Sequence, residues 1–278
     1  MSKNVLRVYN AVCMCSGRST RSNKRNTVII NYLFSYATLG HLADSVKPGG
    51  KLLNTIAEIG IYVINGKKAR GATRRVIPLH ITTLMQRNDI KATAVTHVFK
   101  KTENNLDHQQ LVLFPVLQRM VRNGEEIGHY FLIVLNLRNS RFEILNSMRS
   151  MQDKSLESCC ITIVSAIKRL WGMHYADSRK AIGDYQLLKL KSKNRKTSMP
   201  PHSSALFPFF LQPFFLILFL RACSHDCGFH MLMHIQHWDG RSVCNLDEKN
   251  ICIIRKILTH TWLNFEENDT EWQNILYP

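Results

Sequence analysis

The chain has 278 residues, of which 45% are hydrophobic and 21% are charged. These fractions are ordinary for a soluble globular protein, and the length favours one domain with a full core. Lys and Arg outnumber Asp and Glu by 37 to 20, which leaves a formal net charge of +17. Such a surplus attracts acidic proteins or nucleic acids, but the chain contains no zinc-finger spacing and no aromatic ribonucleoprotein motif.

The N-terminal residues predict a flexible tail rather than a targeting signal. Residues 1–17 contain no continuous apolar core before a small-residue cleavage site, so we expect no signal peptide and an intracellular protein. Residues 1–27 are polar and basic, which favours a loose tail and leaves nuclear localisation open. The chain has eight cysteines, and without a secretory signal we expect thiols rather than a disulfide framework.

The first half of the chain shows a mixed pattern. Residues 28–64 are mainly helical, interrupted by the turn signal at residues 48–50, and residues 59–64 also fit a strand. Residues 80–86 predict a short helix, and the apolar run at residues 111–117 predicts a buried strand.

A β-hairpin is the clearest local prediction. Residues 131–135 are β-branched and apolar, residues 141–145 alternate in polarity, and residues 138–140 between them have turn chemistry. An amphipathic helix follows, because apolar residues recur at helical spacing from Cys160 to Trp171. We interpret that apolar stripe as core.

Two further helical patterns complete the chain. One begins near Phe229 and ends at the stop signal of residues 239–240, and the other spans residues 248–263. Helices with a short antiparallel sheet and no βαβ alternation predict an α+β domain over residues 28–278.

Residues 197–223 form an atypical insert in this domain. They include an apolar run over residues 206–220, which is too short for a membrane span and is interrupted by Pro208 and Pro213, so we expect no membrane association. Phe, Leu, Pro and Ser are largely specified by pyrimidine-rich codons. We therefore hypothesise that the insert is retained intron sequence, which transcript sequencing across it would test.

Cys227 is the cysteine whose neighbours suggest reactivity. Asp226 before it is a good N-cap residue, which places the thiol in the first turn of the following helix. The helix dipole there favours a negatively charged sulfur. Gly228 after it leaves room for the backbone of a substrate. The competing interpretation is a buried helix cysteine without a chemical role.

The predicted hairpin supplies a partner for this thiol. His129 begins its first strand and Asn146 ends its second, so both residues lie toward the same end of the hairpin. A histidine that accepts a thiol proton needs a third group to orient its ring, and an amide oxygen or a carboxylate can do this. His129, Asn146 and Cys227 satisfy that requirement.

Three blocks of sequence around these residues resemble the ubiquitin-like-protein-specific proteases. These are the deSUMOylating enzymes, relatives of adenovirus protease, and the blocks match their C-terminal catalytic domain. The blocks are Gly128–Val134, Phe142–Ser147 and Asp226–Leu232. The resemblance covers residues 38–188 and 224–278, and the plant and transposon-associated branch is the most similar.

The resemblance implies a papain-like cysteine protease fold, similar to that of adenovirus protease. It also implies cleavage of peptide or isopeptide bonds after the C-terminal Gly-Gly of a SUMO-like or ubiquitin-like modifier, so the partners would be such proteins and their conjugates. His129 matches the general base and Cys227 the nucleophile, while Asn146 replaces the usual aspartate. Tyr130 stands where the family has the tryptophan that covers the diglycine end. No cofactor and no metal is implied.

One departure from the family concerns the oxyanion hole. The family's glutamine lies about six residues before the cysteine, where this chain has Arg221, so no oxyanion residue is matched. Losing one oxyanion donor costs on the order of 10²–10³ in rate. Together with Asn146, this leaves open a weakened or inactive pseudo-protease that binds a ubiquitin-like protein.

Two other interpretations remain open. Nucleic-acid binding would rest on the basic charge alone, and its affinity would depend strongly on salt. A zinc site is the other, although the long spacer between the ligand pairs of a zinc finger is missing. Its ligands would come from Cys223, Cys227, His230, His234 and His237.

Overall fold

The computed structural model describes residues 1–17, 22–33, 35–67, 73–122, 124–147, 154–188, 225–240 and 248–277. Its helices are α1 (Lys3–Met14), α2 (Ser22–Asn26), α3 (Leu39–Val46), α4 (Asn54–Gly66), α5 (Leu79–Gln86), α6 (Thr93–Phe99), α7 (Lys101–Asn104), α8 (Lys154–His174), α9 (Cys227–His237), α10 (Glu248–Leu263) and α11 (Trp272–Leu276). Its strands are β1 (Val28–Tyr32), β2 (Ser35–Thr38), β3 (Arg74–Val76), β4 (Leu111–Arg122), β5 (Glu125–Asn136), β6 (Arg141–Leu145) and β7 (Gln186–Leu188).

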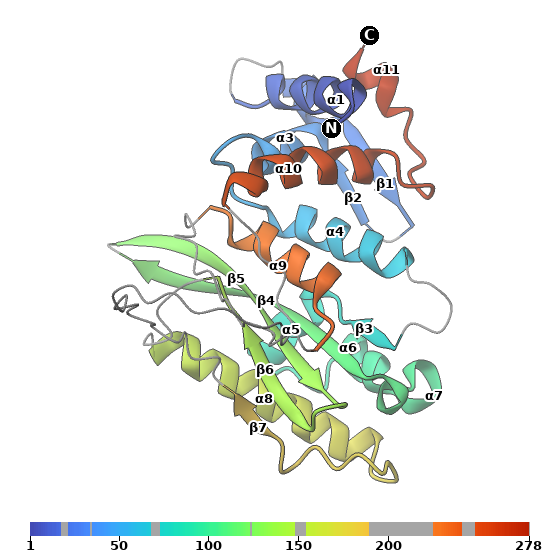
Figure 1. Ribbon diagram of the computed structural model, residues 1–278, viewed down its shortest axis with the longest axis vertical. Coiled ribbons are helices and arrows are strands. Elements are labelled where there is room, and N and C mark those ends of the chain that lie inside the picture. Colours follow the sequence, from blue (N-terminus) through green and yellow to red (C-terminus); the bar gives the residue numbers. More distant parts are fainter. Residues whose placement is uncertain are drawn as a thin grey trace, which may run out of the picture.

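A five-stranded sheet with the order β3-β4-β5-β6-β7 lies in the middle of the molecule (Figure 1). The central strands β4, β5 and β6 are antiparallel, whereas the short edge strands β3 and β7 are parallel to their neighbours. Parallel neighbours need a crossover, and here helices α5 to α7 and helix α8 carry the chain back. The predicted α+β class is confirmed, and the sheet is mixed rather than wholly antiparallel.

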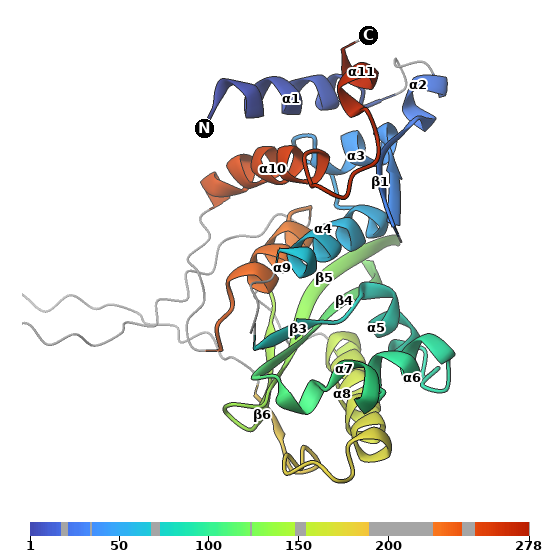
Figure 2. The same ribbon diagram turned by 90° about the vertical axis from the view of Figure 1, so that its right-hand side faces the viewer.

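Alternation along β5 places its side chains in two separate cores. Tyr130, Leu132 and Val134 belong to the core that contains residues of α4, α9 and α10. Phe131 and Ile133 belong to the other core, with residues of α5 and α8. Figures 1 and 2 accordingly show α9 between α4 and the sheet, with α8 on the opposite face.

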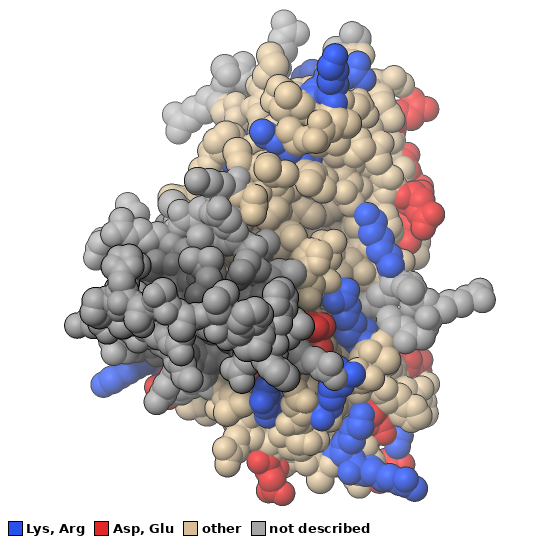
Figure 3. Space-filling view, viewed as in Figure 1, with Lys and Arg blue, Asp and Glu red and all other residues tan. Residues whose placement is uncertain are grey.

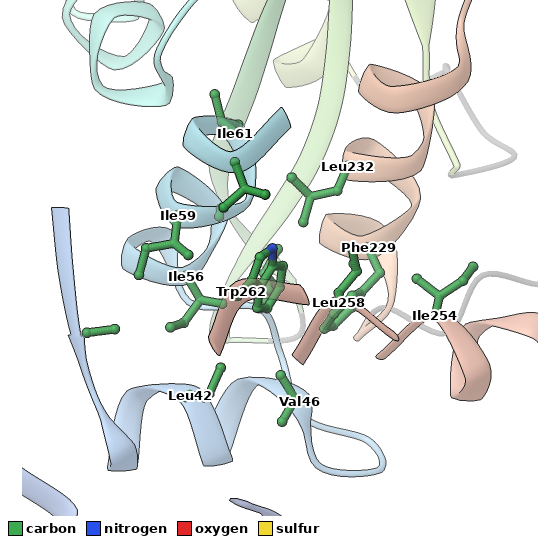
Figure 4. Close-up of a cluster of buried hydrophobic side chains, with 14 of the residues drawn as sticks. Leu42, Val46, Ile56, Ile59, Ile61, Phe229, Leu232, Ile254, Leu258 and Trp262 are labelled. Atoms are coloured by element: carbon green, nitrogen blue, oxygen red, sulfur yellow. The ribbon is translucent and has the colours of Figure 1, made fainter. Parts of the chain in front are cut away.

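The core on the α9 side is filled by large side chains from several helices. Phe229 and Leu232 of α9 point toward Trp262 of α10 and Ile56 of α4 (Figure 4). A Cβ atom at Gly60 of α4 would lie 2.9 Å from Leu232 and 3.3 Å from Trp262. Glycine is therefore what allows α4 to pack this closely against α9 and α10.

A buried carboxylate on β6 anchors the C-terminal end of α9. Glu143 is fully buried, and its Oε2 accepts a hydrogen bond from Trp238 Nε1 at 3.2 Å. Its Oε1 accepts from Asn136 Nδ2 at 3.0 Å and from Arg141 Nε at 2.7 Å. Because a buried carboxylate is stable only with such donors, Glu143 ties the residue that follows α9 to the sheet.

Part of the predicted flexible tail over residues 1–27 is wrong, because residues 3–14 form a packed helix. Helix α1 buries Val8, Tyr9 and Val12 and lies against α3 and α10, and the Tyr9 hydroxyl donates to the Val46 carbonyl at 3.0 Å. These three apolar residues recur at the spacing of one helical face. The basic composition of the segment conceals this short pattern, which is why composition alone predicts a tail.

The other predicted helices and strands include some that the structure confirms and some that it contradicts. The helices at residues 80–86 and 248–263, the strand at residues 111–117 and the β5–β6 hairpin are confirmed. The strand alternative for residues 59–64 is wrong, because they lie within α4. The mainly helical prediction for residues 28–64 is wrong at its start, where β1 and β2 form an antiparallel pair.

The atypical insert, residues 197–223, lies outside the described residues, and its origin stays a hypothesis. Among the helices of the described ranges, none is long and apolar enough to cross a membrane.

Candidate active site

Cys227 is the first residue of α9, the helix that packs against β5. Asp226 occupies the N-cap position, as the sequence predicts, but its side chain makes no capping hydrogen bond. Its Oδ1 instead accepts from Arg255 Nη2 at 2.6 Å. The predicted capping contact is therefore wrong, because a guanidinium binds a carboxylate more strongly than a neutral backbone amide does.

The Cys227 side chain is enclosed, with 4% of its surface exposed. Burial raises the pKa of the Cys227 thiol, and the nearby Asp226 carboxylate raises this pKa further. Hydrogen bonds from the backbone N–H groups of Tyr130 and Gly228 lower the pKa and offset part of this rise. The Tyr130 N–H donates to Cys227 Sγ at 3.4 Å. Since the thiolate is the nucleophile, this site needs a base that removes the thiol proton.

His129 is the predicted base, and it lies on β5, the strand against which α9 packs. It lies within β5 rather than at a strand start, because β5 begins at Glu125 and pairs with β4 along its length. His129 Nε2 and Asn146 Oδ1 are 2.8 Å apart, and Asn146 directly follows β6. The ring is 3% exposed and stacks on Phe131, with centroids 6.0 Å apart. Because Nε2 donates a hydrogen bond to the Asn146 oxygen, Nδ1 is the ring nitrogen suited to accept a thiol proton.

The structure pairs two of the three predicted catalytic residues directly and places the third beside the same strand, and their joint catalytic role stays a prediction. His129 and Asn146 are paired directly, and Cys227 contacts the backbone of Tyr130, the residue after His129. The β5–β6 hairpin supplies the first two residues, and the packing of α9 on β5 supplies the third. A nucleophile, a base and a group that orients the base are the parts that acyl transfer requires.

Tyr130 and Gly228 lie against Leu52, a residue that the sequence pattern does not connect with the site. The Tyr130 hydroxyl donates to the Leu52 carbonyl at 3.0 Å, and Tyr130 is 4% exposed. A Cβ atom at Gly228 would lie 2.7 Å from Leu52 Cβ and 3.1 Å from the Tyr130 ring. Leu52 therefore occupies the space beside Gly228, and contact of Tyr130 or Gly228 with a substrate stays a prediction. Nothing in the local sequence singles out Leu52, which simply precedes a helix.

Two groups are considered as donors to a substrate oxyanion, the Arg221 side chain and the backbone amide of Cys227. Arg221 lies outside the described residues, so its position stays a prediction. The backbone N–H of Cys227 lies in the first turn of α9, where amide groups have no acceptor within the helix. Amides at a helix start stabilise developing negative charge on a substrate oxygen, so the Cys227 amide is a candidate donor.

The zinc interpretation receives no support from the part of the chain that is described. There, no three His, Cys, Asp or Glu side chains form a group that could hold a metal ion. Cys223 lies outside these residues. Burial lowers the pKa of His230 and of His234, the latter to about 4, so both rings are neutral at pH 7.

Figure 3 shows how the Lys and Arg side chains of the described residues are distributed on one face of the molecule. On the face in Figure 3, the visible Lys and Arg side chains stand in separate groups, and several have acidic side chains nearby. Ion pairs such as Arg25–Asp44 at 2.6 Å and Lys101–Asp177 at 2.8 Å occupy part of the positive charge. This described face does not single out a track for a nucleic-acid backbone.

Comparison with known proteins identifies the fold. No family model and no curated protein matches the sequence. The C-terminal Ulp1 protease domain in complex with SMT3, the yeast orthologue of SUMO, has a TM-score of 0.63 and 16% identity, covering 95% of this chain and 95% of that chain. The SUMO protease Ulp1 with its catalytic cysteine oxidised to a sulfenic acid has a TM-score of 0.63 and 15% identity, covering 95% and 94%. The chain therefore has the fold of the Ulp1 protease domain, a small sheet packed against helices.

Proposed function

We propose that this chain is a cysteine-type peptidase that cleaves peptide or isopeptide bonds after the C-terminal Gly-Gly of a SUMO-like modifier. The observation that carries the proposal is the 2.8 Å pair of His129 Nε2 and Asn146 Oδ1, next to a cysteine at a helix start. The substrate class is supported by the fold shared with Ulp1, a SUMO protease. It is also supported by the three sequence blocks that resemble deSUMOylating enzymes.

Acylation begins with proton transfer from the Cys227 thiol to His129 Nδ1, while Asn146 holds the ring through Nε2. The thiolate attacks the carbonyl carbon of the terminal glycine, and the carbonyl oxygen becomes an oxyanion near the Cys227 amide. The tetrahedral intermediate then collapses as the C–N bond breaks. The leaving amine takes the proton from His129, and the glycine remains bound to Cys227 as a thioester.

Deacylation reverses these roles for a water molecule. His129 accepts a proton from water, whose oxygen attacks the thioester carbon. The C–S bond breaks, the proton returns to the Cys227 sulfur, and the modifier leaves with a free carboxylate. Asn146 orients the base in both halves without changing its own charge.

A SUMO that ends in diglycine vinyl sulfone tests the nucleophile and the substrate class together. We expect one covalent adduct on the purified chain, no adduct with Cys227→Ala, and labelling slower by about 100-fold or more with His129→Ala. Cys252→Ala, which removes an exposed thiol on α10, is the matched control and should label like the wild type. An adduct that persists in Cys227→Ala would contradict the assignment of the nucleophile.

A pseudo-protease that binds a SUMO-like protein is the second candidate. The raised pKa of the Cys227 thiol and its 4% exposure favour it, because both reduce the fraction of reactive thiolate. Binding of unmodified SUMO by the folded chain, with no adduct from the probe, would favour this candidate. Loss of both adduct and binding would remove the SUMO-like substrate class.

A further inference from the structure

One guanidinium group connects the segment before Cys227 to the loop between α3 and α4. Arg255 of α10 is 2% exposed, so its charge is almost completely removed from solvent. Its Nη1 donates to the carbonyls of Ser45 at 2.8 Å and Lys47 at 3.1 Å. Its Nη2 donates to the Gly50 carbonyl at 2.8 Å and to Asp226 Oδ1 at 2.6 Å.

The same side chain also packs on α9. Arg255 Cζ lies 4.1 Å from the centre of the Phe229 ring, so the guanidinium is stacked on the second residue after Cys227. The loop that it binds at Gly50 continues to Leu52, which packs against Gly228. Arg255 therefore contacts Asp226 before Cys227 and Phe229 after it. It also binds Gly50, two residues before Leu52, which packs against the start of α9.

A buried guanidinium in this geometry is not interchangeable with another cation. Its planar set of donors binds several oxygens at fixed angles, whereas a lysine ammonium presents only three donors on a flexible chain. A buried charge is retained only when such partners compensate the loss of water. The carboxylate of Asp226 supplies one of them and lies next to the reactive residue.

We propose that Arg255 is a positioning residue for Cys227, which holds the start of α9 in register with His129 and offsets the negative charge of Asp226 beside the thiol. The inference rests on the proposed function only for the role of Cys227 as nucleophile. Asp226 disfavours the thiolate by charge repulsion, and Arg255 reduces that repulsion because the two groups are paired at 2.6 Å.

Other groups near the thiol remain unchanged in the test below. Tyr130 of β5 contacts the thiol, and Glu58 of α4 and Arg119 of β4 interact electrostatically with Tyr130. His230 of α9 interacts electrostatically with Asp226, and His129 of β5 is the predicted base.

The pH profile of Cys227 alkylation by iodoacetamide reports on the thiol without any SUMO-like substrate. The reaction is followed on the Cys227 peptide by mass spectrometry, for variants that circular dichroism shows to be folded. We expect Arg255→Lys to move the midpoint to higher pH, with alkylation about tenfold slower below it. Lys256→Met removes a cation from the adjacent residue of α10, which lies over the Tyr9 ring, and should leave the profile unchanged.

Asp226→Asn tests the Arg255–Asp226 ion pair by removing the negative charge, and it keeps the three carbonyl contacts of Arg255. We expect its alkylation midpoint to move to lower pH, because the repelling charge is gone. In the double variant Arg255→Lys/Asp226→Asn the midpoint should match that of Asp226→Asn alone. The SUMO probe should react with Arg255→Lys about 100-fold more slowly than with the wild type, because the thiol is displaced from its base.

The outcomes separate this inference from the proposed function. If Arg255→Lys and Asp226→Asn both keep the wild-type alkylation midpoint, the inference is overturned, whatever the probe does. If Arg255→Lys does not fold, an unchanged midpoint in Asp226→Asn alone overturns it. If the midpoints shift as expected while no SUMO probe reacts with the wild type, the positioning role stands and the proposed substrate class fails.

Discussion

Asn146 orients His129 with an amide oxygen, which carries no net charge. A carboxylate at this position would bind the same ring nitrogen and would also stabilise the imidazolium that forms when the thiol loses its proton. The 2.8 Å contact shows that the amide is adequate for geometry. At the scale of the residue, the proposed base therefore has an orienting contact but less electrostatic assistance than an aspartate would give.

We expect Asn146→Asp to increase the rate of labelling by the SUMO probe at pH 7 by about tenfold. The added charge favours the thiolate–imidazolium pair, so the rate should rise without a change in the folded structure. Asn146→Ala is the matched control, because it removes the orienting group and should slow labelling. A rate for Asn146→Asp at or below that of the wild type would show that charge at this position does not limit the reaction.

Gly228 is required by packing, and a substitution there tests the contact with Leu52. We expect Gly228→Ala to lower the free energy of unfolding by about 1–3 kcal/mol, because its Cβ would lie 2.7 Å from Leu52 Cβ. Denaturant titration measures this change. Gly172→Ala in α8 is the matched control, because a Cβ there meets nothing within 4 Å, and it should stabilise by about 0.5–1 kcal/mol. Equal effects of the two substitutions would contradict the close packing at Gly228.

Helix α9 is the element on which the site depends, because it carries Cys227 at one end and is held at both. Arg255 binds the residue before it, and Glu143 binds Trp238 just after it. Between these ends, Phe229 and Leu232 pack into the core shown in Figure 4. The helix can therefore keep its first turn in place although Asp226 makes no capping bond.

Helix α1 extends the same core at the N-terminal end of the chain. Its buried residues approach α3 and α10, and α10 carries Arg255. In Figure 1, α1 lies beside α10 and α11, so the first residues of the chain support the helix that positions the nucleophile.

A pair of charge substitutions in α1 tests whether this helix is docked. Val8 is fully buried and Leu6 is 39% exposed. We expect Val8→Asp to lower the free energy of unfolding by about 3 kcal/mol or more, because it leaves an unpaired buried charge. Leu6→Asp, on the exposed side, should change it by less than about 0.5 kcal/mol. Urea titrations of both variants measure the difference, and a flexible tail would make them indistinguishable.

At the scale of the whole molecule, one carboxylate links the two cores. Glu58 of α4 accepts from the backbone N–H groups of Leu79 at 3.1 Å and His80 at 2.7 Å, at the start of α5. The His80 ring also lies 3.0 Å from Glu58, and this hydrogen bond raises the pKa of His80. Folding therefore favours the protonated ring of His80.

This link predicts a pH dependence of stability. Because the pKa of His80 is higher in the folded state, its contribution is fully present below pH of about 6.5 and is lost as the pH rises through the folded pKa. The wild type should exceed His80→Gln in unfolding free energy by about 0.2–1 kcal/mol at pH 6 and by nearly nothing at pH 9. In a Glu58→Gln background, which removes the negative charge beside the ring, the same comparison should show no such trend. A difference that grows with pH would contradict the pairing.

Elements whose signal lies in neighbouring residues could be predicted before the fold was known. The strand at residues 141–145, the helix that carries the apolar stripe from Cys160 to Trp171 and the helix at residues 248–263 all appear in the structure, because periodicity and turn chemistry depend on near neighbours. The hairpin also brought His129 and Asn146 together, since an antiparallel turn returns the chain to the same end.

The surroundings of the Cys227 thiol come from segments that are far apart in the chain and meet only in the folded protein. Arg255 is 29 residues from Asp226 along the chain, and the Tyr130 hydroxyl reaches across 78 residues to Leu52. No local pattern encodes such partners, so a capping bond is predicted where an ion pair forms, and open space is predicted where Leu52 packs. Those contacts depend on how α4, α9 and α10 pack around one core, which is a property of the folded chain as a whole.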